Sequence, residues 1–130
     1  FHSELGKTLG ESLLTPHRSY YKLIRGAMPF IKGISHITGG GLTENVPRIL
    51  PKTLAAQFDI SSWQPLNIFK TLQNHGNITS QEMYRVFNMG LGMILVCDPS
   101  NVEAIKALIP ESIIVGEVIP SSTEERIIYS

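Results

Sequence analysis

Three consecutive glycines, Gly39–Gly41, are the feature that most restricts how this chain can fold. They follow the apolar segment Phe30–Ile37, which predicts a short buried strand, and precede Leu42–Val46, which can form a helical turn. Glycine allows left-handed backbone that other residues avoid, so the run predicts a tight strand-to-helix turn. The same run can form a nest of backbone N–H groups that binds an anion at the helix N-terminus. The glycines alone leave both interpretations open.

Short apolar segments and helical patterns alternate along the rest of the chain. Thr15-Pro16 is typical of a helix start, and the helix that it predicts ends near Pro29. Further strands are expected at 54–60 and 92–97, with 113–119 and 126–129 as a terminal pair, and further helices at 66–74, 81–87 and 99–108. This order predicts an α+β fold, a layered α/β/α domain with a mixed sheet.

The chain has the size and composition of one domain. It holds 130 residues, of which 42% are hydrophobic, and a chain of this length buries roughly two-thirds of its unfolded surface. We expect the domain to cover residues 15–130, with residues 1–14 as an arm or a link to a missing preceding part. The chain opens on Phe1 with no signal-peptide pattern, so we expect a piece of a longer chain.

Several classes of protein are excluded by composition. The apolar runs of the chain are all shorter than the ~18 residues that a membrane-spanning helix needs, so no membrane partner is expected. Cys97 is the single cysteine, which excludes a disulfide framework and predicts a reducing, cytoplasmic location.

The zero net charge conceals two oppositely charged parts. Residues 1–52 hold seven Lys and Arg against three Glu, whereas residues 53–130 hold four against eight acids. Six of the seven basic residues lie between residues 18 and 52, and Glu44 is the single acidic residue in that range. This predicts a basic face for small anions or phosphates, and it is too weak to predict nucleic-acid binding.

Common nucleotide and metal motifs are not matched. Gly39–Gly41 is followed by Leu42-Thr43 rather than the Gly-Lys-Ser/Thr of a P-loop. Gly90-Leu91-Gly92 lacks the third glycine of a dinucleotide fold and precedes a strand. No histidines stand at metal-ligand spacing in the sequence, so no metal ligands are assigned.

Individual polar residues around the glycines have both structural and functional interpretations. His36 can be a hydrogen-bonded structural histidine or a catalytic one. Asn45 and Arg48 can cap a helix or bind phosphate. Trp63 is expected to pack in the core rather than to stack on a base.

Three stretches make a more specific case together. Residues 13–22 read Leu-Leu-Thr-Pro-His-Arg-Ser-Tyr-Tyr-Lys, and residues 34–51 contain Ser-His-Ile-Thr-Gly-Gly-Gly-Leu-Thr-Glu-Asn. Residues 82–93 read Glu-Met-Tyr-Arg-Val-Phe-Asn-Met-Gly-Leu-Gly-Met. In order and spacing the chain resembles the carboxy-terminal domain of the aminoimidazole ribonucleotide synthetase family, the phosphoribosylformylglycinamidine cyclo-ligases. His17 departs from the small or polar residue expected after the Thr-Pro pair.

The resemblance implies an ATP-dependent step of de novo purine biosynthesis. In that family, ATP activates the formyl amide oxygen of formylglycinamidine ribonucleotide, and the amidine nitrogen closes the imidazole ring of aminoimidazole ribonucleotide. The resemblance also implies Mg²⁺, a homodimeric full-length enzyme and a partner in the chain's own N-terminal domain. Since a Mg²⁺–ATP site needs clustered carboxylates and this chain has two aspartates, Asp59 and Asp98, both ATP and Mg²⁺ are expected mainly on that other domain.

The family pattern also implies roles for residues near the glycines. His36 is the candidate catalytic residue, for proton transfer or orientation. The candidate substrate-binding or phosphate-binding residues are Thr38, Gly39, Gly40, Gly41, Asn45 and Arg48, the last for its planar charged fork.

Two alternatives remain open at this stage. The chain can be a binding module that kept the fold without catalysis, or another ATP-using relative of the selenophosphate synthetase or thiamine-monophosphate kinase type. The Thr-Gly-Gly-Gly-Leu-Thr-Glu-Asn run favours the cyclo-ligase, and we expect the 130-residue piece alone to be inactive.

Overall fold

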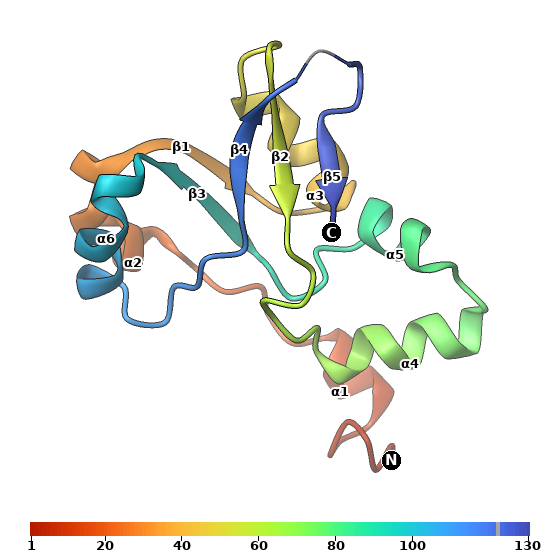
Figure 1. The fold of residues 1–130 in the computed structure, drawn as a ribbon. Helices are drawn as coiled ribbons and strands as arrows, with labels where there is room; N and C mark the ends of the chain where they lie inside the picture. The colour runs from red at the N-terminus through yellow and green to blue at the C-terminus, as the bar shows by residue number, and fades with distance from the viewer. Residues whose placement is uncertain (122) are drawn as a thin grey trace.

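The computed structural model describes residues 1–121 and 123–130. The chain runs through α1 (Leu9–Leu13), α2 (Tyr21–Ile24), the 3-10 helix η1 (Arg25–Phe30), β1 (Ile31–His36), α3 (Gly41–Asn45), the 3-10 helix η2 (Val46–Ile49) and β2 (Leu54–Phe58). It continues through α4 (Asn67–Gly76), α5 (Ser80–Val86), β3 (Met93–Cys97), the 3-10 helix η3 (Pro99–Asn101), α6 (Val102–Leu108), β4 (Gly116–Pro120) and β5 (Ile127–Tyr129) (Figure 1).

Two small sheets form the centre of the molecule. β1 pairs with β3 in antiparallel orientation, and His36 lies opposite Met93. In the second sheet, β2 lies between β4, which is antiparallel to it, and β5, which is parallel. The content of helices and strands and the mixed second sheet confirm the predicted α+β class.

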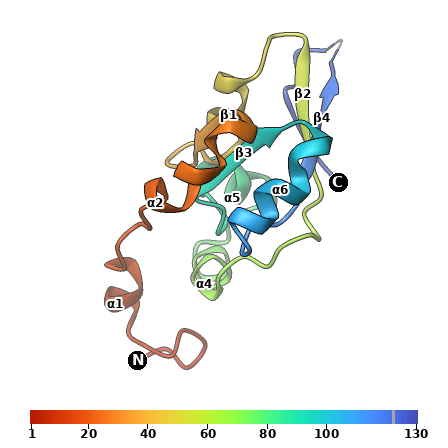
Figure 2. The same ribbon diagram turned by 90° about the vertical axis from the view of Figure 1, so that its left-hand side faces the viewer.

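Separate hydrophobic clusters hold helices to these sheets. α2, η1 and α6 cover one side of β1 and β3, where Ala27, Ile105 and Ile109 are buried together (Figure 2). The larger cluster joins the two sheets to α3 and η2, and it includes Ile37, Leu42, Val46, Phe58 and Trp63. The fully buried Ile37 and Leu42 therefore anchor both ends of the glycine run in the core.

The first helix differs from the prediction. Residues 15–20 form no helix, and α2 begins at Tyr21 without a side-chain cap. The capped helix is α1 instead, because Thr8 and Glu11 form a reciprocal capping box in which the Thr8 hydroxyl accepts from the Glu11 N–H. The expected helix start at Thr15-Pro16 was wrong. Capping residues alone do not form a helix unless the residues that follow them can pack an apolar face on the core.

The predicted terminal strand pair was also wrong as a pair. β4 and β5 do not bond to each other, because β2 lies between them and uses one edge for each. The residues near Pro120 predict a turn from local sequence alone. Which strand each of β4 and β5 pairs with depends instead on which apolar strand the fold brings beside it. Ser122, within the predicted turn, lies outside the described residues.

The remaining elements lie close to their predicted positions. β1, β2 and β3 occupy the segments expected to be strands, and Thr79 caps α5 by accepting from the Glu82 N–H. Within the described part of the chain, no helix combines the length and the apolar character needed to span a bilayer.

Candidate functional site

The glycine run connects the end of β1 to α3. The buried Ile37 donates its N–H to the Gly92 carbonyl, which fixes the strand end against the second glycine motif. Thr38 and Gly39 are exposed, and the Gly41 N–H donates back to the Thr38 carbonyl at 3.1 Å. Gly40, at the N-cap of α3, has φ +92°. The sequence-predicted turn is thus present, with Thr38–Gly40 forming its outer part, which we call the glycine loop.

Gly41 is required by space as well as by backbone conformation. Its φ is +55°, and a Cβ at this position would collide with the Tyr84 carbonyl oxygen and stand 2.7 Å from that of Phe87. α3 therefore packs directly on the C-terminal end of α5. Gly39, by contrast, has open space around it.

Asn45 holds the glycine loop from inside. Its buried side-chain amide nitrogen donates to the carbonyls of Gly41 at 2.8 Å and Gly39 at 3.1 Å, with Thr38 at 3.5 Å. The Asn45 Oδ1 accepts from Arg48 Nη1 at 3.4 Å. The Arg48 side chain is exposed, so its guanidinium is tied to the loop through Asn45 while remaining open to solvent.

Glu44 places a negative charge against the loop. A Cβ on Gly40 would stand 2.6 Å from a Glu44 carboxylate oxygen, and the other oxygen lies 3.8 Å from Arg85 Nη1. Arg85 bonds more closely to Glu82, at 2.6 Å, and this pairing lowers the pKa of Glu82. In the sequence alone, Glu44 stands out only as an isolated acid among basic residues. Its position in the first turn of α3, where acids are favoured, is the signal that could have placed it at the loop.

His36 lies beside another histidine. Its Nε2 is 2.9 Å from the Nε2 of His17, and both rings are exposed. Their centroids are 4.8 Å apart, and Tyr20 borders both rings. From the sequence, His17 is expected only to depart from the family pattern, because no local signal indicates that residue 17 approaches residue 36.

The three stretches that carry the resemblance meet at this place. His17 contacts His36, and Gly41 packs on the carbonyls of Tyr84 and Phe87. The Tyr20 hydroxyl lies so close to Gly92 that a Cβ there would collide with it. Segments far apart in the sequence thus surround the glycine loop.

Aromatic residues support α3 from below. Tyr84 lies between Trp63 and Tyr129, at ring-centroid distances of 6.3 and 5.0 Å. The Tyr129 hydroxyl is 2.9 Å from Thr43 Oγ1 on α3, and burial raises the pKa of both Tyr84 and Tyr129. Trp63 donates from Nε1 to the Met89 carbonyl and is 7% exposed, which confirms its predicted packing role.

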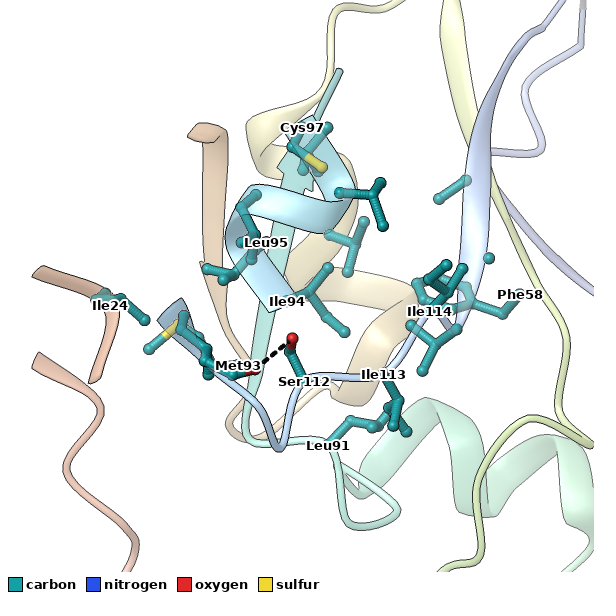
Figure 3. Close-up of a pocket in the computed structure, with 18 of the residues that line it drawn as sticks. Ile24, Phe58, Leu91, Met93, Ile94, Leu95, Cys97, Ser112, Ile113 and Ile114 are labelled. Carbon is teal, nitrogen blue, oxygen red and sulfur yellow. Dashed lines mark hydrogen bonds between the residues drawn. The ribbon is translucent and has the colours of Figure 1, made fainter. Parts of the chain in front are cut away.

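A separate cavity of about 680 Å³ lies between β3, α6 and β4 (Figure 3). Its walls are mainly aliphatic, with Ile94, Ile113 and Ile114 among them, and burial raises the pKa of the Cys97 thiol at its edge. Ser112 Oγ donates to the Ile109 carbonyl at 2.7 Å, so this hydroxyl is already bonded. No residue of the glycine loop lines the cavity. Its chemistry suits apolar contact rather than phosphate binding.

Carboxylates suited to Mg²⁺ are not gathered in the described residues. Three or more His, Cys, Asp or Glu side chains nowhere come together in residues 1–121 and 123–130 in a way that could hold a metal ion. Both aspartates serve turns: Asp59 accepts from Ser61 and Asp98 from Ser100, and these bonds lower the pKa of each carboxyl. These residues do not fit a Mg²⁺ site.

Comparison with known proteins gives matches over nearly the whole chain. Residues 1–128 match the family described as AIR synthase related protein, C-terminal domain. The phosphoribosylformylglycinamidine cyclo-ligase of Enterococcus faecalis is 46% identical over 123 residues, which cover 91% of this chain and 35% of that protein. The protein of the same name from Thermoanaerobacter pseudethanolicus is 44% identical over 126 residues, 93% of this chain and 38% of the relative. The protein of the same name from Neisseria gonorrhoeae is 47% identical over 106 residues, which cover 80% of this chain and 31% of the relative. The chain therefore spans about a third of the length of the curated relatives it matches.

Proposed function

The chain belongs to the family of AIR synthase related proteins, as their C-terminal domain, and from this premise we propose that it is the carboxy-terminal part of a phosphoribosylformylglycinamidine cyclo-ligase. The parent enzyme would convert formylglycinamidine ribonucleotide to aminoimidazole ribonucleotide with ATP, a step of de novo purine biosynthesis. The observation that carries the proposal is identity of 44–47% to proteins of that name over most of this chain.

ATP and Mg²⁺ are assigned to the other part of the parent. The described residues bring no group of three or more candidate metal ligands together, so no step of the mechanism passes through Mg²⁺ here. We propose that this domain supplies only part of the active site, namely the glycine loop and the residues around it. It would face the N-terminal domain of the same parent chain, and the parent would act as a homodimer in the cytoplasm.

We assign the glycine loop, in which Thr38 and Gly39 are exposed and Gly40 is half-buried, to binding of substrate or of the transferred phosphoryl group. Thr38, Gly39 and Gly40 form the outer loop, and Arg48 adds a guanidinium tied to it through Asn45. An anion bound at the glycine loop would be repelled by the Glu44 carboxylate, which lies against Gly40. Binding therefore requires the Glu44 side chain to turn away from Gly40 and towards Arg85.

The buried members act by holding the loop. Asn45 satisfies the loop carbonyls, and Gly41 lets α3 approach α5. Both are therefore positioning residues in this proposal. His36 has an exposed imidazole at the end of a paired strand, which suits it to move or orient a proton at its Nε2.

A chimera tests this function. This chain replaces the matching third of the Enterococcus faecalis relative, and ADP release is measured with ATP and formylglycinamidine ribonucleotide. We expect turnover from the chimera and none from the 130-residue chain alone. Arg48→Ala should lower turnover at least tenfold, whereas Lys106→Ala, on α6, should not change it.

The chimera is judged only when it is folded. Its melting transition is compared with that of the unaltered relative. A folded chimera that binds both substrates and releases no ADP would refute the proposed function.

A further inference from the structure

His17 and His36 form an exposed pair of imidazoles that the proposed function uses only in part. The two Nε2 atoms lie 2.9 Å apart, and the ring planes are inclined by 72°. His36 is held at the end of β1, where it lies opposite Met93. His17 approaches from the irregular segment before α2.

Their contact places one hydrogen between two nitrogens. One ring donates from Nε2 and the other accepts with its Nε2 lone pair, as neutral imidazoles do. If the donating ring carries its hydrogen on Nδ1 instead, both Nε2 lone pairs become available. The pair can then coordinate one cation without a net change in protons.

The separation of the nitrogens selects the type of cation. Imidazole nitrogens bind late divalent transition metals at about 2.0–2.1 Å. Two such bonds at a right angle place the nitrogens about 2.9 Å apart, whereas a tetrahedral angle requires about 3.4 Å. Cu²⁺ and Ni²⁺ take tetragonal sites with right angles between neighbouring ligands, and Cu²⁺ binds most tightly in the divalent series.

We propose that His17 and His36 form a two-imidazole site for a tetragonal divalent metal ion, Cu²⁺ or Ni²⁺. Water would complete the coordination, since both rings are exposed and no three-membered group of ligand side chains exists in the described part of the chain. The neighbouring Arg18 charge is offset by an ion pair with Glu111 at 2.7 Å. The repulsion that a cation would meet there is reduced accordingly.

A second pair of histidines in the chain lacks the geometry of the proposed site. The rings of His2 and His75 also meet edge-on, but their centroids are 6.3 Å apart. His75 Nδ1 is bonded to the Thr71 carbonyl at 2.9 Å. This pair therefore has the same residue types without the two nitrogens at ligand spacing.

A bound ion would occupy the same nitrogen that the proposed function gives to proton transfer. It would then inhibit the parent enzyme, an effect that rests on the proposed function. Binding itself is independent of that function and is measured on this chain without an activity assay.

Cu²⁺ titration of the 130-residue chain tests the site, followed by visible absorption and by broadening of amide NMR signals. All proteins carry His2→Gln, because a free N-terminal amine next to a histidine is itself a copper ligand, and His75 then serves as a single control imidazole. We expect His17→Gln and His36→Gln each to weaken binding at least tenfold, and His75→Gln to leave it within twofold. Broadening should centre on Tyr20, whose ring borders both histidines, and on Ile37 and Gly92, which are bonded to each other beside the end of β1 that carries His36.

Pulsed EPR of the protein with the pair intact provides a measurement that needs no change at either histidine. Two coordinated imidazoles on one Cu²⁺ are expected. One imidazole, equal losses in the His75→Gln control, or broadening centred elsewhere would each overturn the proposal. Amide spectra of the metal-free variants show that each remains folded.

Discussion

The two glycine motifs of this domain, Gly39–Gly41 (the first) and Gly90–Gly92 (the second), lie side by side but exclude a side chain for different reasons at Gly41 and Gly92. At Gly41 the obstacle to a side chain is backbone, the carbonyls of Tyr84 and Phe87, and φ is positive as well. At Gly92 the obstacle is the hydroxyl end of the Tyr20 side chain, and the backbone is ordinary. A side chain can rotate away, whereas the C-terminal end of α5 cannot move without disturbing the core.

The motifs differ in polar support too. Asn45 is committed to the carbonyls of the first motif, and Thr43 joins α3 to Tyr129 beneath it. The second motif is held by the bond from the Ile37 N–H to the Gly92 carbonyl and by Asn88, whose side-chain and backbone oxygens accept from the Gly90 and Leu91 N–H groups. A side chain at residue 41 would thus meet fixed backbone, whereas one at residue 92 would meet a movable side chain, and the following substitutions test this difference.

Gly41→Ala should have the largest effect. The new Cβ meets fixed backbone and the residue must keep a positive φ, so we expect a loss of more than about 4 kcal/mol in the free energy of unfolding. Urea denaturation measures it, and absence of a cooperative transition is the extreme form of the same result. Gly39→Ala, with open space around it, is the matched control and should stay within about 0.5 kcal/mol. Equal effects at both positions would contradict the distinction.

Asn45→Ala should rank second. It leaves the buried Gly41 carbonyl and the part-buried Gly39 carbonyl without their donor, which costs about 1–3 kcal/mol. Asn101→Ala is the control, because its amide makes a single longer bond of 3.4 Å to the Phe30 carbonyl. Urea denaturation gives the stability, and amide NMR shifts report whether Gly39 and Gly40 move. An unchanged loop spectrum would remove Asn45 from its positioning role.

Gly92→Ala should be milder, at about 1–2 kcal/mol, as overpacking against a movable side chain. Tyr20→Phe removes the hydroxyl that the new methyl group meets, so the double variant should recover part of the loss. A double-mutant cycle by urea denaturation measures this coupling, which we expect to exceed about 0.5 kcal/mol. Additive effects would show that Tyr20 is not the obstacle. Tyr21→Phe, at an exposed tyrosine, is the control and should give no recovery.

The smallest effect should be on the loss of thermal stability at alkaline pH that comes from Tyr129, the tyrosine that packs beneath the first motif. Burial raises the pKa of Tyr129 above its unfolded value near 10, so the neutral phenol is the form that the fold stabilises. This stabilisation is complete below pH of about 10 and is lost as pH rises through the folded pKa. Tyr129→Phe should therefore flatten the fall in melting temperature above about pH 10. Tyr21→Phe should leave that fall unchanged, and a steeper fall in Tyr129→Phe would contradict the assignment.

Much of the candidate site was predictable because its signals are local. The strand before the glycines, the turn and the short helix after them follow from residues within about ten positions of one another. The resemblance likewise named the correct family from three contiguous stretches. The roles of individual glycines were not predictable, because Gly39, Gly40 and Gly41 are identical in sequence and differ only in what lies opposite them.

The sequence by itself determined the α+β class, the positions of β1, β2 and β3, and the family, since periodicity, turn residues and motif order act over short range. Only the tertiary structure decided that β2 separates β4 from β5, that Glu44 lies against Gly40, and that His17 meets His36. Each of these depends on which surfaces the core brings together. Packing satisfies apolar area and backbone hydrogen bonds over the whole chain at once, so no single stretch of sequence specifies the outcome.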